Sequence, residues 1–131
     1  FFFKQKTAYE IVDCDWSSDV CSSDLVDGLG VVSHFAPLGE SWALRIQAPA
    51  ELARYLAYKG SVTVNGVSLT VNQVSDNPQG CEISINLIPH TVTHTALSQL
   101  QAGAQVNLEI DTVARYVERM LSAGLNLKAP A

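Results

Sequence analysis

Two hydroxyl side chains in SVTVNGVSLTVNQV, residues 61–74, have the spacing of a polar row on one strand. Ser68 and Thr70 lie two residues apart, so on a β-strand both side chains point to the same face. A hydroxyl can donate and accept hydrogen bonds, and such a pair can bind the edge of a planar ligand. The same spacing is also typical of a solvated strand face. The residue types alone favour the solvated face.

A second candidate lies in NLIPHTVTHT, residues 86–95, where His90 and His94 are four residues apart. On a helix this spacing places both imidazoles on one face, as in a metal-binding pair. Pro89 and the β-branched residues around the histidines favour a non-helical segment instead. No carboxylate or thiol joins them in this segment. The sequence therefore predicts no metal site, and it predicts that both histidines lie in a surface loop.

A third candidate is Asp111, which stands where alternating apolar residues give way to helical spacing. Aspartate is a preferred N-cap of helices, and Thr112 could serve in the same way. Position alone favours the capping role. No phosphate-binding loop, nucleophile elbow or pair of acids occurs elsewhere in the sequence.

The elements that must position these residues are short strands. Apolar and polar residues alternate, with the two-residue period of half-buried strands, over 42–48, 61–64, 67–71, 81–88 and 105–111. Asn65–Gly66 is the preferred pair for a tight type I′ turn between two of them. A short helix is expected over 49–60, a loop over 75–80, and an amphipathic helix from Thr112 up to Gly124.

This order of elements predicts an all-β fold, a small antiparallel barrel or sandwich with a short internal helix and a C-terminal helix. About six strands close better as a barrel, because closure removes exposed edges. Composition limits the partners that this domain can have. The formal net charge of −5 predicts no nucleic-acid partner, and the apolar runs are too short to span a bilayer, so no membrane contact is expected.

Residues 1–25 are excluded from this fold. KQKTAYE (4–10) and DWSSDVCSSDL (15–25) can both be written as codons of a common sequencing-library adapter, in one frame, with room between them for a short index. We interpret residues 1–25 as a non-native, disordered segment and not as a signal peptide, since the apolar stretch of a signal is missing. Cys81 is the one cysteine after them, which predicts a reducing, cytoplasmic setting.

Three segments, YKGSVTVNGVSLTVNQV, NLIPHTVTHTAL and VNLEIDTVARYVERML, resemble in order and spacing the carboxyl-terminal half of riboflavin synthase. VDGLGVV (26–32) resembles the opening of that half, although the Gly-His that the family carries before the valine is absent. The resemblance implies a six-stranded antiparallel Greek-key barrel that binds lumazine over 26–111, an oligomerisation helix over 112–123 and a tail over 124–131.

For function, the resemblance implies the dismutation of two 6,7-dimethyl-8-ribityllumazine molecules to riboflavin and 5-amino-6-(ribitylamino)uracil, the last step of riboflavin biosynthesis. A four-carbon unit is transferred without a metal or organic cofactor, in a homotrimer. In this family each active site lies between barrels of two subunits. Since the amino-terminal barrel is not in this sequence, we expect the chain alone to bind ligand and to turn over poorly. A non-catalytic lumazine- or flavin-binding protein of the same fold is the alternative.

The family's catalytic positions fall here on Ser68, Thr70 and Asp111, where Asp111 would be a site acid or would accept from the ribityl chain, besides its capping role. The resemblance therefore favours ligand contact over a solvated face for the hydroxyl row. The family's substrate contacts fall on Val26, Lys59, Ser68, Leu69, Thr70, Asn86, Leu87, Ile88, Pro89, His90 and Thr91.

Overall fold

The alternating segments form strands in the computed structural model, which describes residues 25–124. The interpretations of residues 1–24 as adapter and of 125–131 as a tail lie outside the described residues. The strands are β1 Gly28–Leu38, β2 Ser41–Pro49, β3 Ser61–Val64, β4 Val67–Thr70, β5 Gln73–Asn77, β6 Gly80–Leu87 and β7 Gln105–Ile110. The helical elements are α2 Ala50–Ala53, α3 Pro89–His94, the 3₁₀ turn η2 Ala96–Gln99 and α4 Thr112–Ser122.

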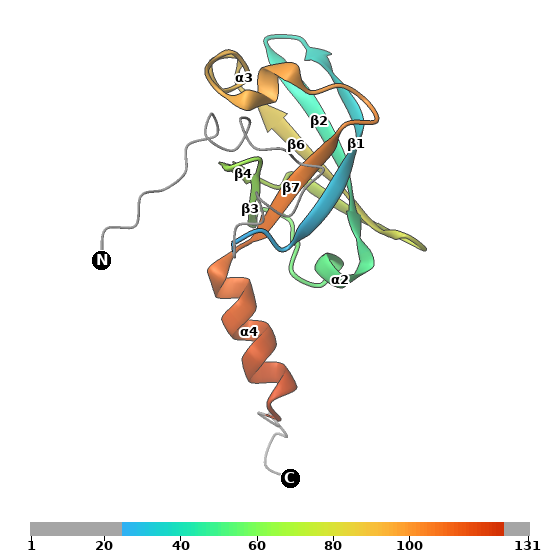
Figure 1. Ribbon diagram of the computed structural model, residues 1–131, viewed down its shortest axis with the longest axis vertical. Helices are drawn as coiled ribbons and strands as arrows, with labels where there is room; N and C mark the ends of the chain where they lie inside the picture. Colours follow the sequence, from blue (N-terminus) through green and yellow to red (C-terminus); the bar gives the residue numbers. More distant parts are fainter. Residues whose placement is uncertain (1–24, 125–131) are drawn as a thin grey trace, which may run out of the picture.

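All strands pair in one curled antiparallel sheet, in the order β4-β3-β7-β1-β2-β6-β5 (Figure 1). Leu44, Ile46 and Leu108 are among the side chains that fill its concave side, and each is fully buried. The all-β antiparallel architecture is confirmed. The count of six strands is wrong, since the sheet has seven. Closure is also wrong, because within residues 25–124 no ladder joins the end strands β4 and β5.

The additional strand is β5, in a stretch whose composition predicted a loop over 75–80. Asp76 pairs with Cys81 and Asn77 with Gly80, so Pro78 and Gln79 alone form the turn. An edge strand has a neighbour on one side only, and most residues of β5 are exposed. Backbone hydrogen bonds hold such a strand without an apolar pattern, which is why composition misses it.

The expected hairpin of β3 and β4 is present, and its turn is anchored to β7. Asn65 and Gly66 have φ angles of 47° and 82°, as a type I′ turn requires. Asn65 is buried, and its Oδ1 accepts the backbone N–H of Asn107 at 2.8 Å. Its own N–H donates to the Asn107 carbonyl at 3.0 Å. The turn residue therefore fixes the hairpin against the adjacent strand.

We expect Asn65→Ala to lower the free energy of unfolding by about 2–3 kcal/mol, because it strands a buried N–H and places an alanine at positive φ. Urea denaturation followed by circular dichroism measures the loss. Asn65→Gly keeps the backbone conformation accessible and should cost about 1–2 kcal/mol, the hydrogen-bond part alone. Equal losses in the two variants would contradict a conformational contribution.

The segment after β6 is helical, which corrects the expectation that His90 and His94 lie in a loop. Pro89 occupies the first turn of α3, where proline loses no helical hydrogen bond. The Thr93 hydroxyl donates to the Pro89 carbonyl at 3.1 Å. The Thr95 hydroxyl donates to the Thr91 carbonyl at 2.6 Å. Bonds of this kind to a carbonyl one turn back are what threonine hydroxyls form in helices.

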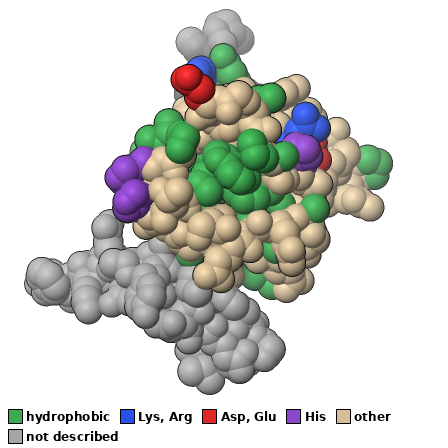
Figure 2. All heavy atoms as spheres, turned by 90° about the horizontal axis from the view of Figure 1, so that it is seen from above, with side chains coloured by type: hydrophobic (Ala, Val, Ile, Leu, Met, Phe, Trp, Pro, Cys, Tyr) green, Lys and Arg blue, Asp and Glu red, His purple; other side chains and the backbone are tan. Residues whose placement is uncertain are grey.

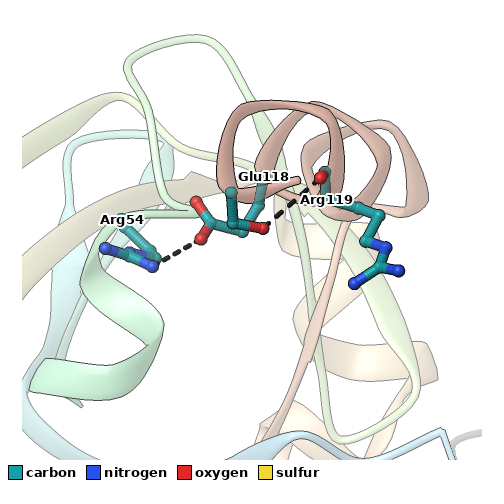
Figure 3. A network of polar contacts seen from close by, with 4 residues as sticks. Arg54, Glu118 and Arg119 are labelled. Atoms are coloured by element: carbon teal, nitrogen blue, oxygen red, sulfur yellow. Dashed lines mark hydrogen bonds and ion pairs between the residues drawn. The ribbon is translucent and has the colours of Figure 1, made fainter. Parts of the chain in front are cut away.

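The C-terminal helix α4 extends away from the sheet and is held to it through its polar side (Figure 1). Arg115 forms an ion pair with Asp27, just before β1. Glu118 forms another with Arg54, just after α2 (Figure 3). No residue of α4 is buried. In the described part of the chain, no helix has the length and apolar character needed to cross a membrane.

Candidate functional site

Ser68 and Thr70 lie on β4 with exposed side chains, whereas Leu69 between them is buried. The hydroxyl row therefore points away from the core, as a ligand contact requires. Leu69 packs into the core, and it pairs with Val62 of β3, so its role at a ligand site is to hold β4 in place.

The hairpin geometry also fixes where the backbone of β4 points. Val64 and Val67 flank a two-residue turn, so they form a hydrogen-bonded pair, and such pairs alternate along the ladder. Ser68 and Thr70 occupy the other class of position. Their N–H and C=O groups consequently point away from β3, toward the free edge of the sheet.

The curl of the sheet brings this free edge to β6. The Asn72 N–H, two residues beyond Thr70, donates to the Ser84 carbonyl of β6 at 2.8 Å. The two strands run antiparallel, so the same register places Thr70 opposite Asn86 and Ser68 opposite Ile88. The pairing of β5 with β6 ends at Ser84. The backbone of Asn86 therefore faces β4 with no strand between them.

This arrangement leaves two backbone edges facing each other. One edge carries the amide groups of Ser68 and Thr70, and the other carries those of Asn86. Within residues 25–124 no ladder connects β4 to β6. We call these residues the β4–β6 seam. A planar ring with alternating donors and acceptors could bind both edges, as an added strand would.

The residues after Asn86 divide into core and surface. Leu87 is 2 % exposed and Ile88 62 %, so Ile88 is the apolar side chain presented at the seam. Its carbonyl accepts the Thr91 N–H at 3.0 Å, which starts α3. The half-buried Thr91 and the exposed Pro89 lie in the first turn of this helix.

The two imidazoles of α3 lie on one exposed face. The His90 and His94 rings stack with centroids 3.9 Å apart, and His94 Nδ1 lies 3.0 Å from the His90 carbonyl oxygen. Figure 2 shows histidine side chains at the surface of this end of the molecule, beside apolar side chains. Among the described residues, no three potential ligands gather as a metal site would need.

Lys59 stands beside the end of β4. Its N–H donates to the Val71 carbonyl at 2.8 Å, and its φ of 66° is left-handed. The side chain is exposed, with Nζ 5.4 Å from the centre of the Tyr58 ring. Lys59 is therefore a charged group close to the seam.

Val26 and Asp111 are not brought to the seam. Val26 is half-buried just before β1, and β3 and β7 lie between β1 and β4 in the sheet. Asp111 Oδ1 accepts the Val113 N–H at 2.9 Å, so it caps α4, as its position alone predicted. Ile110 pairs with Val62, which puts Asp111 level with Thr70 but about 10 Å away, two strand spacings.

We expect Asp111→Ala to destabilise the chain by about 1 kcal/mol through loss of this cap. Asp111→Ser should retain most of the stability that the alanine variant loses, since serine caps nearly as well. Thermal unfolding of the two variants separates the roles: a ligand-binding loss in the stable serine variant would indicate a function beyond capping.

Sequence reasoning missed two acids. The Asp27 carboxylate accepts the Ile110 N–H at 2.7 Å and pairs with Arg115, so it joins β1, β7 and α4. Its partners are distant in the chain, and no local pattern could have revealed them. Burial raises the pKa of Glu109 on β7 above its usual 4.5. The alternating pattern of β7 placed Glu109 on the polar face but gave no sign of its desolvation.

Comparison with known proteins assigns this fold to a family. Residues 23–111 match the sequence profile described as the lumazine binding domain. The chain belongs to the lumazine-binding domain family. This lumazine-binding domain is 42 % identical over 96 residues to riboflavin synthase of Photobacterium phosphoreum, with 73 % of this chain and 42 % of the relative covered.

Riboflavin synthase of Mycobacterium tuberculosis (strain ATCC 25618 / H37Rv) is 44 % identical over 101 residues, with 76 % of this chain and 49 % of the relative covered. The chain thus spans less than half the length of these relatives. The crystal structure of LumP complexed with riboflavin matches with a TM-score of 0.60 at 24 % identity, covering 68 % of this chain and 46 % of LumP. LumP complexed with 6,7-dimethyl-8-(1'-D-ribityl) lumazine gives 0.57 at 24 % identity, covering 67 % and 46 %. At this identity the likeness establishes the fold of the lumazine-binding domain.

Proposed function

We propose that this lumazine-binding domain is the carboxyl-terminal domain of a riboflavin synthase, which converts two molecules of 6,7-dimethyl-8-ribityllumazine to riboflavin and 5-amino-6-(ribitylamino)uracil. The riboflavin synthases at 42–44 % identity support the reaction. The observation that carries the assignment is the β4–β6 seam. Its facing amide edges suit a flat heterocycle whose pyrimidine-dione edge alternates carbonyl and N–H groups.

In this proposal the backbone groups of Thr70 and Asn86 bind the dione edge. Ile88 covers one face of the ring, and the burial of apolar ring surface adds to the hydrogen bonds. The Ser68 and Thr70 hydroxyls, with Lys59, His90 and Thr91 around the seam, contact the reacting methyl group or the ribityl chain. Leu69, Leu87 and Pro89 hold the backbone in place. Val26 lies before β1 and Asp111 after β7, away from the seam, so neither contacts the ring in this proposal.

The chemistry needs orientation more than a strong catalyst. The 7-methyl group of the lumazine is acidic, because the carbanion that it leaves delocalises into the ring. Holding two lumazines in reacting geometry can supply roughly 7–11 kcal/mol of the barrier. Hydroxyl, imidazole and carboxyl groups are adequate for the remaining proton transfers. We propose no metal and no organic cofactor.

We also propose that the protein assembles as a homotrimer through α4. Apolar residues at helical spacing on α4 are exposed, which inverts the usual orientation of a surface helix. They are Val113, Tyr116, Val117, Met120 and Leu121. A second copy that presents the same apolar face would cover them. A cytoplasmic location, with no nucleic-acid partner, completes the proposal.

The alternative function is a non-catalytic lumazine- or flavin-binding protein, which the LumP structures favour through their shared fold. Two measurements on the purified chain separate the functions. Fluorescence titration with 6,7-dimethyl-8-ribityllumazine measures binding. Deuterium exchange at the 7-methyl group, followed by proton NMR, measures the first proton transfer of the synthase.

A synthase domain should bind the lumazine saturably and accelerate this exchange, while a binding protein should bind without accelerating it. Riboflavin formation by residues 1–131 alone is expected to be poor. Fast turnover would contradict that expectation, and absence of any lumazine binding would contradict both functions.

A further inference from the structure

A row of polar side chains crosses three strands and ends at the seam. Thr63 of β3 is paired with Glu109 of β7 on one side and with Ser68 of β4 on the other. All three side chains point away from the core, because their chain neighbours Val62, Val64, Leu69, Leu108 and Ile110 are buried. The row therefore consists of one carboxyl group followed by two hydroxyl groups, and the last of them, Ser68, lies beside the proposed ligand.

The spacing of the row suits a relay. Directly opposite residues in antiparallel strands have Cβ atoms about 4.5–5.5 Å apart. A glutamate can therefore reach the neighbouring threonine, and the threonine can reach the serine. The Thr63–Ser68 pair belongs to the non-hydrogen-bonded class derived above, in which the side chains stand closest.

A second carboxyl, that of Asp111, is aligned with a neighbouring row of hydroxyl groups. Asp111 and Glu109 differ in the hydrogen bonds that they form. Asp111 stands level with Ser61 and Thr70, but its carboxylate is engaged by the Val113 N–H. Glu109 is half-buried, and within residues 25–124 its carboxylate forms no hydrogen bond or ion pair. It is a desolvated acid whose oxygens are not occupied.

The charged groups around Glu109 include Asp27, Arg115 and Asp111. Asp27 stands before β1, with its N–H bonded to the Leu108 carbonyl, and its charge is balanced by Arg115 of α4. Asp111 follows on the same strand side, and β3 contributes only hydroxyl groups. Desolvation is the cause of the raised pKa of Glu109.

We propose that Glu109 is the terminal proton acceptor of a relay through Thr63 and Ser68, and that it, not Asp111, holds the proton taken from the lumazine. This inference rests on the proposed function. A C–H bond of the 7-methyl group breaks, and its electron pair passes into the ring. The proton goes to the Ser68 oxygen as the Ser68 proton goes to Thr63 and the Thr63 proton to the Glu109 carboxylate. Glu109 thus acts through Thr63 and Ser68 and does not itself touch the lumazine.

The relay predicts the direction of pH dependence. Only the carboxylate form of Glu109 can accept a proton, so exchange at the 7-methyl group should slow as pH falls through the folded-state pKa. Since burial raises that pKa, the inflection should lie above the usual carboxyl value of 4.5.

The test measures 7-methyl deuterium exchange in the lumazine bound to the full chain, together with lumazine affinity. Glu109→Gln should slow exchange by about 100-fold or more, abolish the acidic inflection and leave affinity unchanged. Thr63→Val interrupts the relay, retains a β-branched side chain for the strand, and should slow exchange similarly. Glu40→Gln, the same change in the exposed β1–β2 turn, is the matched control and should exchange like the original protein.

The outcomes separate the two proposals. If the unaltered chain does not bind the lumazine, or binds it without accelerating exchange, the proposed function fails. If it does both and Glu109→Gln exchanges at the same rate with the same inflection, the relay is wrong. Loss of the inflection in Asp111→Asn but not in Glu109→Gln would assign the proton to Asp111 and overturn the inference. Circular dichroism confirms that each variant is folded.

Discussion

Replacing Thr70 by proline is expected to weaken lumazine binding by roughly 10- to 100-fold, the equivalent of one lost hydrogen bond to a buried polar group. The Thr70 N–H faces the β4–β6 seam and not β3, so the substitution removes a donor to the ligand without breaking the ladder. Proline is tolerated on edge strands in this position. Fluorescence titration measures the affinity, and urea denaturation should show a stability loss below about 1 kcal/mol.

Thr70→Val is the matched control, because it removes the hydroxyl and keeps the backbone N–H. If the backbone edge binds the ring, the valine variant should retain most of the affinity that the proline variant loses. Equal losses of affinity in both variants would mean that the ligand binds the Thr70 hydroxyl and not the backbone N–H. Unchanged affinity in both would place the ligand away from the seam.

The residues of the seam could be predicted from sequence, but the seam itself could not. The alternation in 67–71 placed Ser68 and Thr70 on a polar face, and Asn65–Gly66 fixed the turn that sets their pairing. The opposition of Thr70 and Asn86 depends on a hydrogen bond between Asn72 and Ser84 across the ends of a curled sheet. Local patterns carry no information about such a register.

The errors have the same origin. Strand β5 is polar and lies at an edge, so its ladder to β6 is visible only in three dimensions. Helix α3 was missed because propensity weighs β-branched residues without their surroundings, here Pro89 in the first turn and Val92 buried against the core. In both places tertiary context outweighs residue preference.

Helix α4 has two faces that differ in their contacts. On its polar side, Arg115 and Glu118 form ion pairs with Asp27 and Arg54. Its apolar side is exposed. Exposed ion pairs contribute little stability individually. They can nevertheless fix the direction in which a helix presents its other face. Single substitutions on the exposed apolar face should therefore disrupt the proposed trimer.

We expect Val117→Glu to convert the proposed trimer to monomers without unfolding the sheet. Val117 is 45 % exposed, so a charge there costs the isolated chain no more than about 0.5 kcal/mol. In a trimer the same carboxylates would be buried close to one another, where burial and like charge both oppose association. Sedimentation velocity over a range of protein concentrations measures the change.

Arg119→Glu supplies the control, since Arg119 is an exposed α4 residue whose side chain has no ion pair in the described part of the chain. It reverses a charge on the same helix and should leave the trimer intact. Dissociation by both variants would mean that net charge, not the apolar face, governs assembly. If the unaltered protein sediments as a monomer, the proposed trimer contact through α4 is wrong.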